Sequence, residues 1–359
     1  KRQHHQLAQA ASRIRQLNSP AIAHFNHART TLHPSIPRKG HDNRAMTTSP
    51  LALPQLPPGF AGGACELTHL SVLEANGPDA VSFLHNQLTH DFALLAPGQA
   101  RLCGYCSPKG RMLASFVGFK RSPDRVLLVC SRDVAASTLK RLSMFVLRAK
   151  VKLSDVTSQF HVQGWVGPVL QQQAGVLNLT PWQHHALDSG DLITLYPALG
   201  QARALWLSES PPPLLPPLSH DAWMGLEVLS GVAQVQAPTV DAFVPQMLNY
   251  ESVDGVSFKK GCYPGQEVVA RSQFRGAIKR RAQLYLSSSA VAAGTELFLS
   301  TESSQPAGLV AQSAPWGDGT VLIASVQLSL LETTGDVLQD SQGHVLTPLP
   351  LPYELRHDL

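Results

Sequence analysis

The most constraining feature of this sequence is a cysteine in a glycine-flanked turn, directly before a short helical pattern. The run reads Lys259-Lys260-Gly261-Cys262-Tyr263-Pro264-Gly265-Gln266-Glu267. Pro264 and Gly265 stand in the order that the two central positions of a type II turn favour. The next stretch, 266–271, is acidic at its start and basic towards its end, which is typical of a helix. We therefore predict that the thiol of Cys262 lies just before a helix N-terminus.

Two chemical features of this run favour a reactive, functional cysteine over a structural one. A helix N-terminus and nearby cations both stabilise the thiolate, which is the reactive form of cysteine. The alternative is a buried cysteine in a tight turn, the usual situation of a lone cysteine. We interpret Cys262 as the functional thiol. The cations expected to bias its charge are Lys259, Lys260 and Arg271, and the residues expected to shape its turn are Gly261, Pro264 and Gly265.

Composition limits the classes of protein that remain. The chain has 359 residues, enough for two or three domains, with 43% hydrophobic and 15% charged residues. No apolar run approaches the roughly 20 residues of a membrane-spanning helix, so we expect no membrane partner. The five cysteines are few and odd in number, which suits a reducing compartment better than a disulfide scaffold.

The first 45 residues differ from the rest in charge. They hold eight Lys/Arg and one acid, Asp42, and removing their +7 from the net +4 leaves −3 for the other 314 residues. That balance argues against a protein built mainly to coat nucleic acid. The segment ends just before Met46 and reads as translated upstream sequence or, alternatively, as a transit peptide. The first reading places the protein in the bacterial cytoplasm and the second in the mitochondrial matrix.

The remaining sequence reads as mixed α+β with a small β-barrel at its C-terminal end. The run 211–217 is too rich in proline for a helix or central strand and is expected to be a loop. Beyond Gly276, short alternating strands separated by turn residues predict the barrel. We expect helices after Asp79 as N-cap, from about Asp133, and over 219–229. We expect strands over 65–74, 100–118, 125–130, 151–153, parts of 160–208, 282–286, 296–299, 308–312 and 320–326.

These elements suggest four segments. Residues 1–45 are left out of the fold, and 46–63 form a Pro/Gly-rich lead-in. Residues 64–275 form the α+β region, with two subdomains, and 276–355 form the barrel.

Two other patterns have structural readings. Cys103 and Cys106 match C-x-x-C, but redox pairs of this kind begin helices, whereas these residues lie in a predicted strand. No second cysteine pair completes a zinc site, and no histidines have the spacing of metal ligands, so no metal is expected. Trp223 lies on the predicted helix 219–229, where an aromatic side chain usually belongs to the core.

Basic residues gather around the cysteine turn and along the stretch that follows it. In a body that is otherwise acidic, such a group can hold an anion: a glutamate tail, a phosphate or an RNA backbone. The alternative is a solvated charged surface. The residues are Lys259, Lys260, Arg271, Arg275, Lys279, Arg280 and Arg281.

The cysteine run resembles the Lys-Gly-Cys-Tyr-x-Gly-Gln-Glu signature of the YgfZ family, folate-binding relatives of the glycine-cleavage T-protein. The likeness continues in 243–249, 255–258 and 269–276. A second block, from Gly77 through 83–91 to Pro108-Lys109-Gly110-Arg111, resembles the family's N-terminal region. The first block is highly specific, whereas the second is shared with the wider T-protein superfamily. Together they extend the resemblance from about residue 67 into the C-terminal barrel.

The resemblance implies a three-domain ring around a central folate cavity, with tetrahydrofolate as the cofactor. It implies that Trp223 stacks on the folate ring, and Glu227, one helical turn on, would then accept a hydrogen bond from the flat pterin. Tyr263 and Gln266 are expected to face the cavity. The residues assigned to folate are Trp223, Glu227, Lys259, Lys260, Gly261, Tyr263, Gly265, Gln266, Glu267 and Arg271.

The resemblance also implies a biological role. It points to assembly or repair of iron–sulfur clusters and, through cluster enzymes such as tRNA methylthiotransferases, to tRNA modification. Because such clusters are generally held by four protein ligands, one thiol cannot carry a stable cluster alone. Cys262 would therefore be a transient ligand, a redox group or a partner in formaldehyde chemistry with folate.

Two alternative functions predict different behaviour. An aminomethyl or one-carbon transferase of the T-protein type needs an acidic pair after a glycine turn. The matching stretch, Gly110-Arg111-Met112-Leu113-Ala114-Ser115, has none, and Leu and Ala cannot exchange a proton. A tRNA-binding module would use the basic residues from Arg271 to Arg281, and its RNA affinity would fall steeply with salt. We expect an accessory folate-binding factor rather than an aminomethyltransferase.

Overall fold

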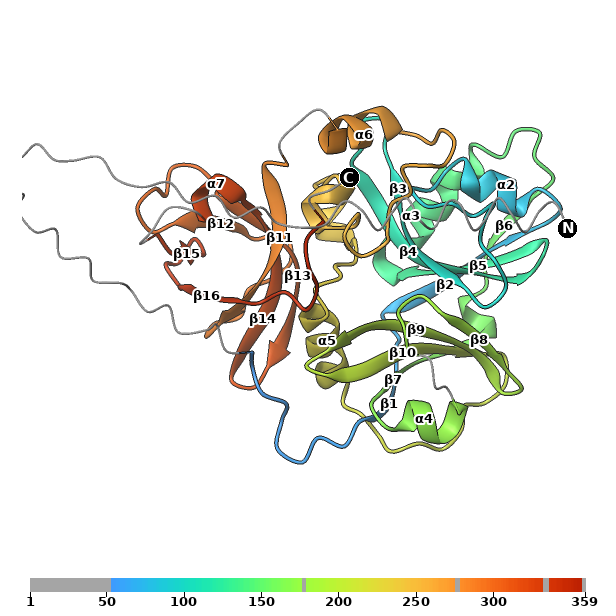
Figure 1. Ribbon diagram of the computed structural model, residues 1–359, viewed down its shortest axis with the longest axis horizontal. Coiled ribbons are helices and arrows are strands. Elements are labelled where there is room, and N and C mark those ends of the chain that lie inside the picture. Colours follow the sequence, from blue (N-terminus) through green and yellow to red (C-terminus); the bar gives the residue numbers. More distant parts are fainter. Residues whose placement is uncertain (1–52, 176–178, 275–277, 332–335, 357–359) are drawn as a thin grey trace, which may run out of the picture. The chain divides into compact units, whose positions relative to one another are not determined.

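The computed structural model describes residues 53–175, 179–274, 278–331 and 336–356, and shows three antiparallel sheets (Figure 1). The predicted segment 1–45 and the first part of the lead-in lie outside the described residues. The first sheet has the order β1 (Gly63–Glu66), β7 (His161–Val166), β10 (Gln201–Ser208), β9 (Gly190–Ala198), β8 (His184–Leu187). The second has the order β3 (Ala100–Cys106), β4 (Met112–Ser122), β5 (Arg125–Ser131), β2 (Leu70–Asn76), β6 (Lys152–Asp155).

The third sheet confirms the predicted C-terminal barrel. Its two outermost strands approach each other, because Gln339 in one forms a bridge with Val345, just before the other. The sheet is therefore nearly closed, which removes most of its exposed edge. Its order is β15 (Leu338–Gln339), β12 (Glu296–Leu299), β13 (Gly308–Trp316), β14 (Gly319–Gln327), β11 (Arg280–Ser287), β16 (Leu346–Leu349).

Helices begin close to the residues that the sequence indicates. Ser219 caps the helix 220–229, because its hydroxyl accepts a hydrogen bond from the amide of Ala222 at 3.2 Å. Asp79 occupies the predicted N-cap position, but its carboxylate accepts from the backbone amide of Lys150 at 2.6 Å instead. The helices are α2 (Ala80–His85), α3 (Arg132–Ser143), α4 (Val169–Ala174), α5 (His220–Leu229), α6 (Gln266–Phe274) and α7 (Leu328–Leu331). Single 3₁₀ turns are η1 (Thr157–Gln159), η2 (Ala237–Thr239) and η3 (Pro245–Leu248).

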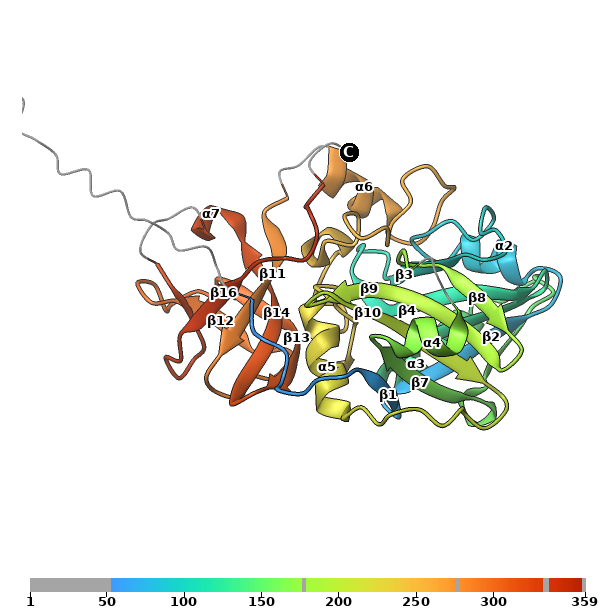
Figure 2. The ribbon, with the colours of Figure 1, turned by 60° about the horizontal axis from the view of Figure 1, so that its bottom comes forward.

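Helix α5 packs between the first sheet and the barrel (Figures 1 and 2). Two glycines make this possible by leaving room for an indole on each side. A Cβ added to Gly164 of β7 would lie 2.3 Å from the Trp223 ring, and one added to Gly225 would lie 2.2 Å from the ring of Trp316. Both indoles are buried. This packing fixes the direction in which α5 presents its remaining side chains.

The predicted single strand over 65–74 is wrong. The chain leaves the first sheet after Glu66, turns at 67–69 and enters the second sheet at Leu70, so that two strands replace one. The apolar alternation continues across the break because both flanks are buried. Strands β15 and β16 and helix α7 were also not predicted from the sequence. They are short, and the two strands are defined by partners far away in the chain.

Candidate functional site

The cysteine turn lies on the surface in front of α6, as the sequence predicts. Cys262 is exposed and α6 begins at Gln266. The thiol borders a groove of about 440 Å³. The groove is lined by Pro108, Cys262, Tyr263, Gly265, Gln266, Glu267, Val268 and Ala270.

Lys260 anchors this turn to α2 rather than standing free beside the thiol. Only 8% of the residue is exposed. Its Nζ donates to the backbone carbonyl of His85, the last residue of α2, and at 2.7 Å to that of Leu88, after the following turn. It also lies 4.6 Å from the centre of the Tyr263 ring. Burial lowers the pKa of Lys260 to about 8, against the opposing pull of the Asp91 carboxylate. The lysine therefore satisfies carbonyls that the end of a helix leaves unpaired.

An imidazole also faces the turn, and sequence reasoning did not single it out. His85 Nδ1 lies 3.1 Å from Asp91 Oδ1, and His85 Nε2 is 3.6 Å from the place of a Cβ added to Gly261. The His85–Asp91 pair therefore borders the backbone next to Cys262. Both residues belong to the second block of the family resemblance, and their spacing of six residues was the available signal.

The turn of the β3–β4 hairpin packs directly against the cysteine turn. Gly265 has φ +79°, and a Cβ there would lie 2.4 Å from the Ser107 carbonyl oxygen and 2.6 Å from Gly110 Cα. Gly110 itself has φ +72° and packs on Val268 of α6. The two glycines are therefore needed for two reasons: they adopt the positive φ of the turns, and they let the two turns contact each other closely.

We expect Gly265→Ala to destabilise the protein by at least about 2 kcal/mol, because it adds a backbone clash to the strain of a left-handed residue. Gly200→Ala is the matched control, since Gly200 has φ +74° but no atom within 4 Å of an added Cβ. Thermal unfolding of the two variants measures the difference. Equal losses of stability would show that the contact between the turns contributes nothing.

Arg271 and Glu267 contact each other rather than the thiol. They form an ion pair at 2.8 Å on the outer face of α6, with side chains 66% and 83% exposed. Exposed pairs at this helical spacing contribute little to stability. Lys259 is exposed as well. The positive charge near Cys262 is therefore divided between a buried lysine and surface residues.

Glu227 lies elsewhere, at a cavity of about 40 Å³ between the first two sheets and α5. Trp223 does not line this cavity but contacts Arg203, which does. No residue of 259–271 lines this cavity, so the structure does not bring the two predicted groups of site residues together. Tyr263 and Gln266, which were expected to face the folate cavity, line the surface groove instead. The cavity is lined by Leu102, Val117, Trp182, Leu195, Tyr196, Arg203, Leu205, Glu227, Ser230, Val232, Ala233 and Gln234.

The cavity contains a buried pair of opposite charges. Arg203 Nη2 lies 3.9 Å from Glu227 Oε1, and both side chains are almost completely buried. Burial raises the pKa of Glu227, opposed by the positive charge of Arg203, and burial lowers the pKa of Arg203 to about 10. Glu227 also accepts from Gln234 at 3.0 Å and from Gln312 at 3.4 Å.

Several polar atoms at this cavity have no hydrogen-bond partner within the described residues. They are Arg203 Nε and Nη2 and Gln234 Oε1, and the Nε1 of Trp223, which does not line the cavity, is likewise without a partner. Arg203 also lies over the Trp223 ring, 4.5 Å from its centre. Because buried polar groups normally have partners, such a cluster indicates a binding position. Arg203 was not predicted, although a single arginine inside the apolar strand β10 was a signal in the sequence.

Comparisons with known proteins agree with this arrangement. The GCVT N-terminal domain family matches residues 61–183. The tRNA-modifying protein YgfZ of Edwardsiella ictaluri is 32% identical over 78% of this chain and 89% of its own length. The chain belongs to the YgfZ family. The tRNA-modifying protein YgfZ of Serratia proteamaculans is 30% identical over 80% of this chain and 91% of its own length.

A solved structure supports the fold of this YgfZ-family chain. Aminomethyltransferase T of the glycine cleavage system from Bartonella henselae matches with a TM-score of 0.59. The match covers 82% of this chain and 87% of that chain at 16% identity, so it concerns the fold alone. The predicted T-protein-like α+β fold is confirmed. None of the helices in the described ranges combines the length and apolar character needed to cross a membrane.

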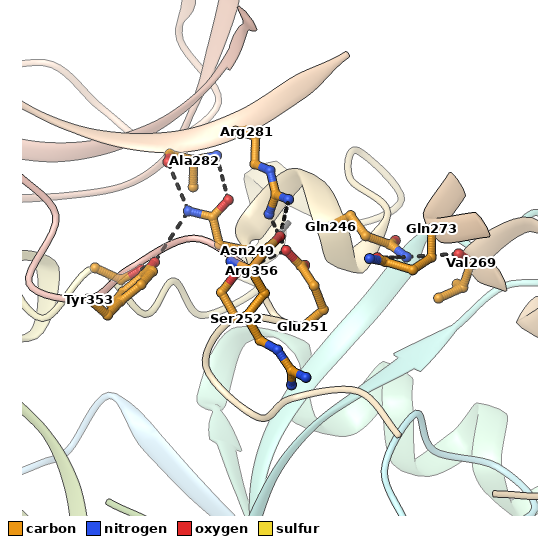
Figure 3. A network of polar contacts seen from close by, with 11 residues as sticks. Gln246, Asn249, Glu251, Ser252, Val269, Gln273, Arg281, Ala282, Tyr353 and Arg356 are labelled. Carbon is orange, nitrogen blue, oxygen red and sulfur yellow. Dashed lines mark hydrogen bonds and ion pairs between the residues drawn. The ribbon is translucent and has the colours of Figure 1, made fainter. Parts of the chain in front are cut away.

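The other sequence block of this YgfZ-family member, 243–249, has an architectural role (Figure 3). Gln246 Nε2 donates to the carbonyl of Val269 in α6 at 2.8 Å. Asn249 Nδ2 donates to the carbonyl of Ala282 in β11 at 2.9 Å, and Asn249 has φ +59°. These side chains tie the cysteine helix and the barrel to the same turn.

The burial of Arg281 shows that the predicted basic patch is wrong at this position. It is 3% exposed and forms an ion pair with the buried Glu251, and its Nη2 donates to the carbonyl of Arg356 at 3.1 Å (Figure 3). Arg275 lies outside the described residues. Arg271 to Arg281 therefore do not form one continuous RNA-binding surface, because charge that reads as exposed in the sequence is used inside the fold.

The C-x-x-C pattern is structural, as predicted. Cys103 and Cys106 are both buried in β3 rather than at a helix N-terminus. Burial raises the pKa of each thiol, that of Cys106 to about 12. These thiols stay protonated at neutral pH, which leaves Cys262 as the exposed one of the five.

Proposed function

We propose that this chain is a folate-binding factor that supports tRNA modification by assisting iron–sulfur cluster enzymes in the cytoplasm. The observation that carries the proposal is the cavity, where Arg203 and Gln234 leave polar atoms without hydrogen-bond partners. The relatives named as tRNA-modifying proteins support the biological role. The aminomethyltransferase-like fold and the membership of the YgfZ family support a folate as the ligand.

The polar groups at the cavity fit the chemistry of a pterin. A pterin ring is flat, with neighbouring N–H groups on one edge and acceptors on another. Glu227 keeps lone pairs beyond those that Gln234 and Gln312 use, and these can accept from the N–H edge. Arg203 supplies donors for the acceptor edge. These residues would bind and orient tetrahydrofolate, which supplies the one-carbon chemistry when bound.

The cavity must enlarge to admit the ring. Its volume of about 40 Å³ suits a few water molecules, whereas small-molecule pockets are typically about 300–1,000 Å³. Gln234 follows α5 in a stretch without regular secondary structure and is the polar side chain expected to move. Trp223 is fully buried with Arg203 over its ring. Stacking of a pterin on Trp223 stays a prediction that requires Arg203 to shift.

We assign the cluster-related step to Cys262 at the surface groove. The thiol is exposed and has room beside it for a protein partner. As a thiolate it would supply one iron ligand to a cluster that belongs to a client enzyme, with the other ligands coming from that client. Lys260, His85 and Asp91 surround the backbone at this position and would hold the turn in shape.

Glu227→Gln tests the folate site. The substitution keeps the shape of the side chain but removes its charge, and hydrogen bonds to charged groups contribute about 1.5–3 kcal/mol. We expect tetrahydrofolate affinity, measured by calorimetry, to fall about tenfold to hundredfold. Glu209→Gln, on a side chain 49% exposed and away from the cavity, is the matched control and should bind normally. Unchanged affinity in Glu227→Gln, or no binding to the wild type, would refute the site.

A further inference from the structure

A segment without acids lies at the end of α3 and has no part in either site described above. It reads Lys140-Arg141-Leu142-Ser143-Met144-Phe145-Val146-Leu147-Arg148-Ala149-Lys150-Val151-Lys152. Five of these 13 residues are cations. Because residues 46–359 carry a net −3, this concentration of positive charge is local. We call the segment 140–152 the α3 patch.

Four of the five cations of the α3 patch are exposed, as are several of its apolar side chains, whereas Arg141 is partly buried. None of its five cations forms an ion pair within the residues that the structure describes. Asp79, which contacts the patch, accepts from the backbone amide of Lys150 rather than pairing with a cation. Met144 is 60% exposed, Phe145 43% and Leu147 85%. Cations interleaved with exposed apolar and aromatic side chains are typical of surfaces that bind single-stranded nucleic acid.

A groove of about 310 Å³ opens beside the patch. Its apolar walls come from Leu113, Met144 and Val240, and its polar groups from Ser137, Thr138 and Arg141. The Nε of Arg141 has no hydrogen-bond partner in the described part of the chain. Apolar walls with a few hydrogen-bonding groups suit one nucleobase, which needs a flat contact and polar partners at its edge.

We propose that the α3 patch binds RNA, with phosphates on its cations and one unpaired base in the groove beside Arg141. This inference rests on the proposed role in tRNA modification for the identity of the RNA, although the charge and the groove stand without it. An anionic membrane would also attract cations and exposed apolar residues. Ser137, Thr138 and Arg141 favour RNA, since acyl chains offer these groups no partner, and the apolar face of α3 is already buried in the core.

The test measures binding of a fluorescent, unmodified tRNA transcript by anisotropy between 50 and 200 mM salt. The full chain is used, so residues 1–45 contribute the same background charge to every variant. The variant Lys140→Gln/Arg148→Gln/Lys150→Gln removes three cations of the patch. The matched control, Lys259→Gln/Lys279→Gln/Arg280→Gln, removes the same charge from the part of the chain around α6. Phe145→Ala removes the exposed aromatic ring without changing charge.

We expect the patch variant to bind at least tenfold more weakly at 100 mM salt. The slope of log K against log salt should become shallower by about 2 to 3, because each phosphate contact contributes roughly 0.7–0.9. The control variant should stay within about threefold of the wild type. Phe145→Ala should bind several-fold more weakly with an unchanged slope.

Equal losses in the patch and control variants would overturn the proposal, as would a wild type that does not bind the transcript. A surface that binds anionic phosphatidylserine vesicles but not the transcript would be assigned to lipid instead. Tetrahydrofolate titration of the patch variant should match the wild type. A failure of folate binding with an intact RNA result would reject the folate cavity and leave the α3 patch standing.

Discussion

Cells that lack their own copy of this protein should recover when given the wild-type chain and should not recover with Cys262→Ala. The expected loss of activity is complete, because Cys262 is the exposed thiol of the chain and the other four cysteines are buried. The variant should keep its thermal stability and its tetrahydrofolate affinity within about twofold. The side chain that is removed is exposed and lies outside the folate cavity.

Two further variants make this result specific. Cys262→Ser keeps a polar group of similar size but has no sulfur to bind iron, so it should fail as Cys262→Ala does. Cys130→Ala removes a buried thiol of β5 and should restore growth. Recovery with Cys262→Ala would contradict the role assigned to this thiol. The cavity would then be the one remaining candidate site.

Arg281→Met should produce the largest loss of stability among the substitutions considered. It leaves the carboxylate of Glu251 buried without its partner, and breaking a buried pair in this way costs about 3–5 kcal/mol. For a chain of this size the expected decrease in Tm is about 5–8 °C. Arg271→Met, which breaks the exposed pair on α6, is the matched control and should change stability by less than about 1 kcal/mol.

The double variant Arg281→Met/Glu251→Leu distinguishes two causes of the lost stability: the missing ion pair and the buried carboxylate left without its partner. Replacing both charges by apolar groups removes the uncompensated carboxylate, so most of the lost stability should return. Differential scanning calorimetry of the three variants gives the comparison. An Arg281→Met protein as stable as the Arg271→Met control would show that the Glu251 carboxylate is not confined as the structure places it.

Local features of the sequence predicted local structure well. Ser219 marks the start of α5, and Gly265 marks the turn before α6, because a cap and a left-handed turn depend on neighbouring residues. The division between β1 and β2 was not predicted, since it depends on which sheet each strand joins. The burial of Lys260 and Arg281 was not predicted either, because it depends on contacts with residues distant in the sequence. Their partners, the carbonyl of His85 and the carboxylate of Glu251, lie 175 and 30 residues away.

The candidate site, too, could be predicted from the sequence only in part. Cys262 and its turn could be identified from one continuous motif, and the structure places the turn directly before α6 as expected, but not at the cavity with Glu227. The cavity requires Arg203 from β10 and Gln234 from beyond α5 in addition to Glu227, and no sequence spacing relates these three residues. The sequence motif therefore located the thiol, whereas only the fold separates it from the cavity proposed for folate.

A crystal structure of the wild-type chain with tetrahydrofolate tests this separation most directly. We expect the pterin ring in the cavity, with its edges on Arg203 and Glu227, the Gln234 side chain displaced, and Cys262 free on the surface. A ring bound in the groove beside Cys262, with Arg203 Nε and Gln234 Oε1 still without hydrogen-bond partners, would contradict this assignment.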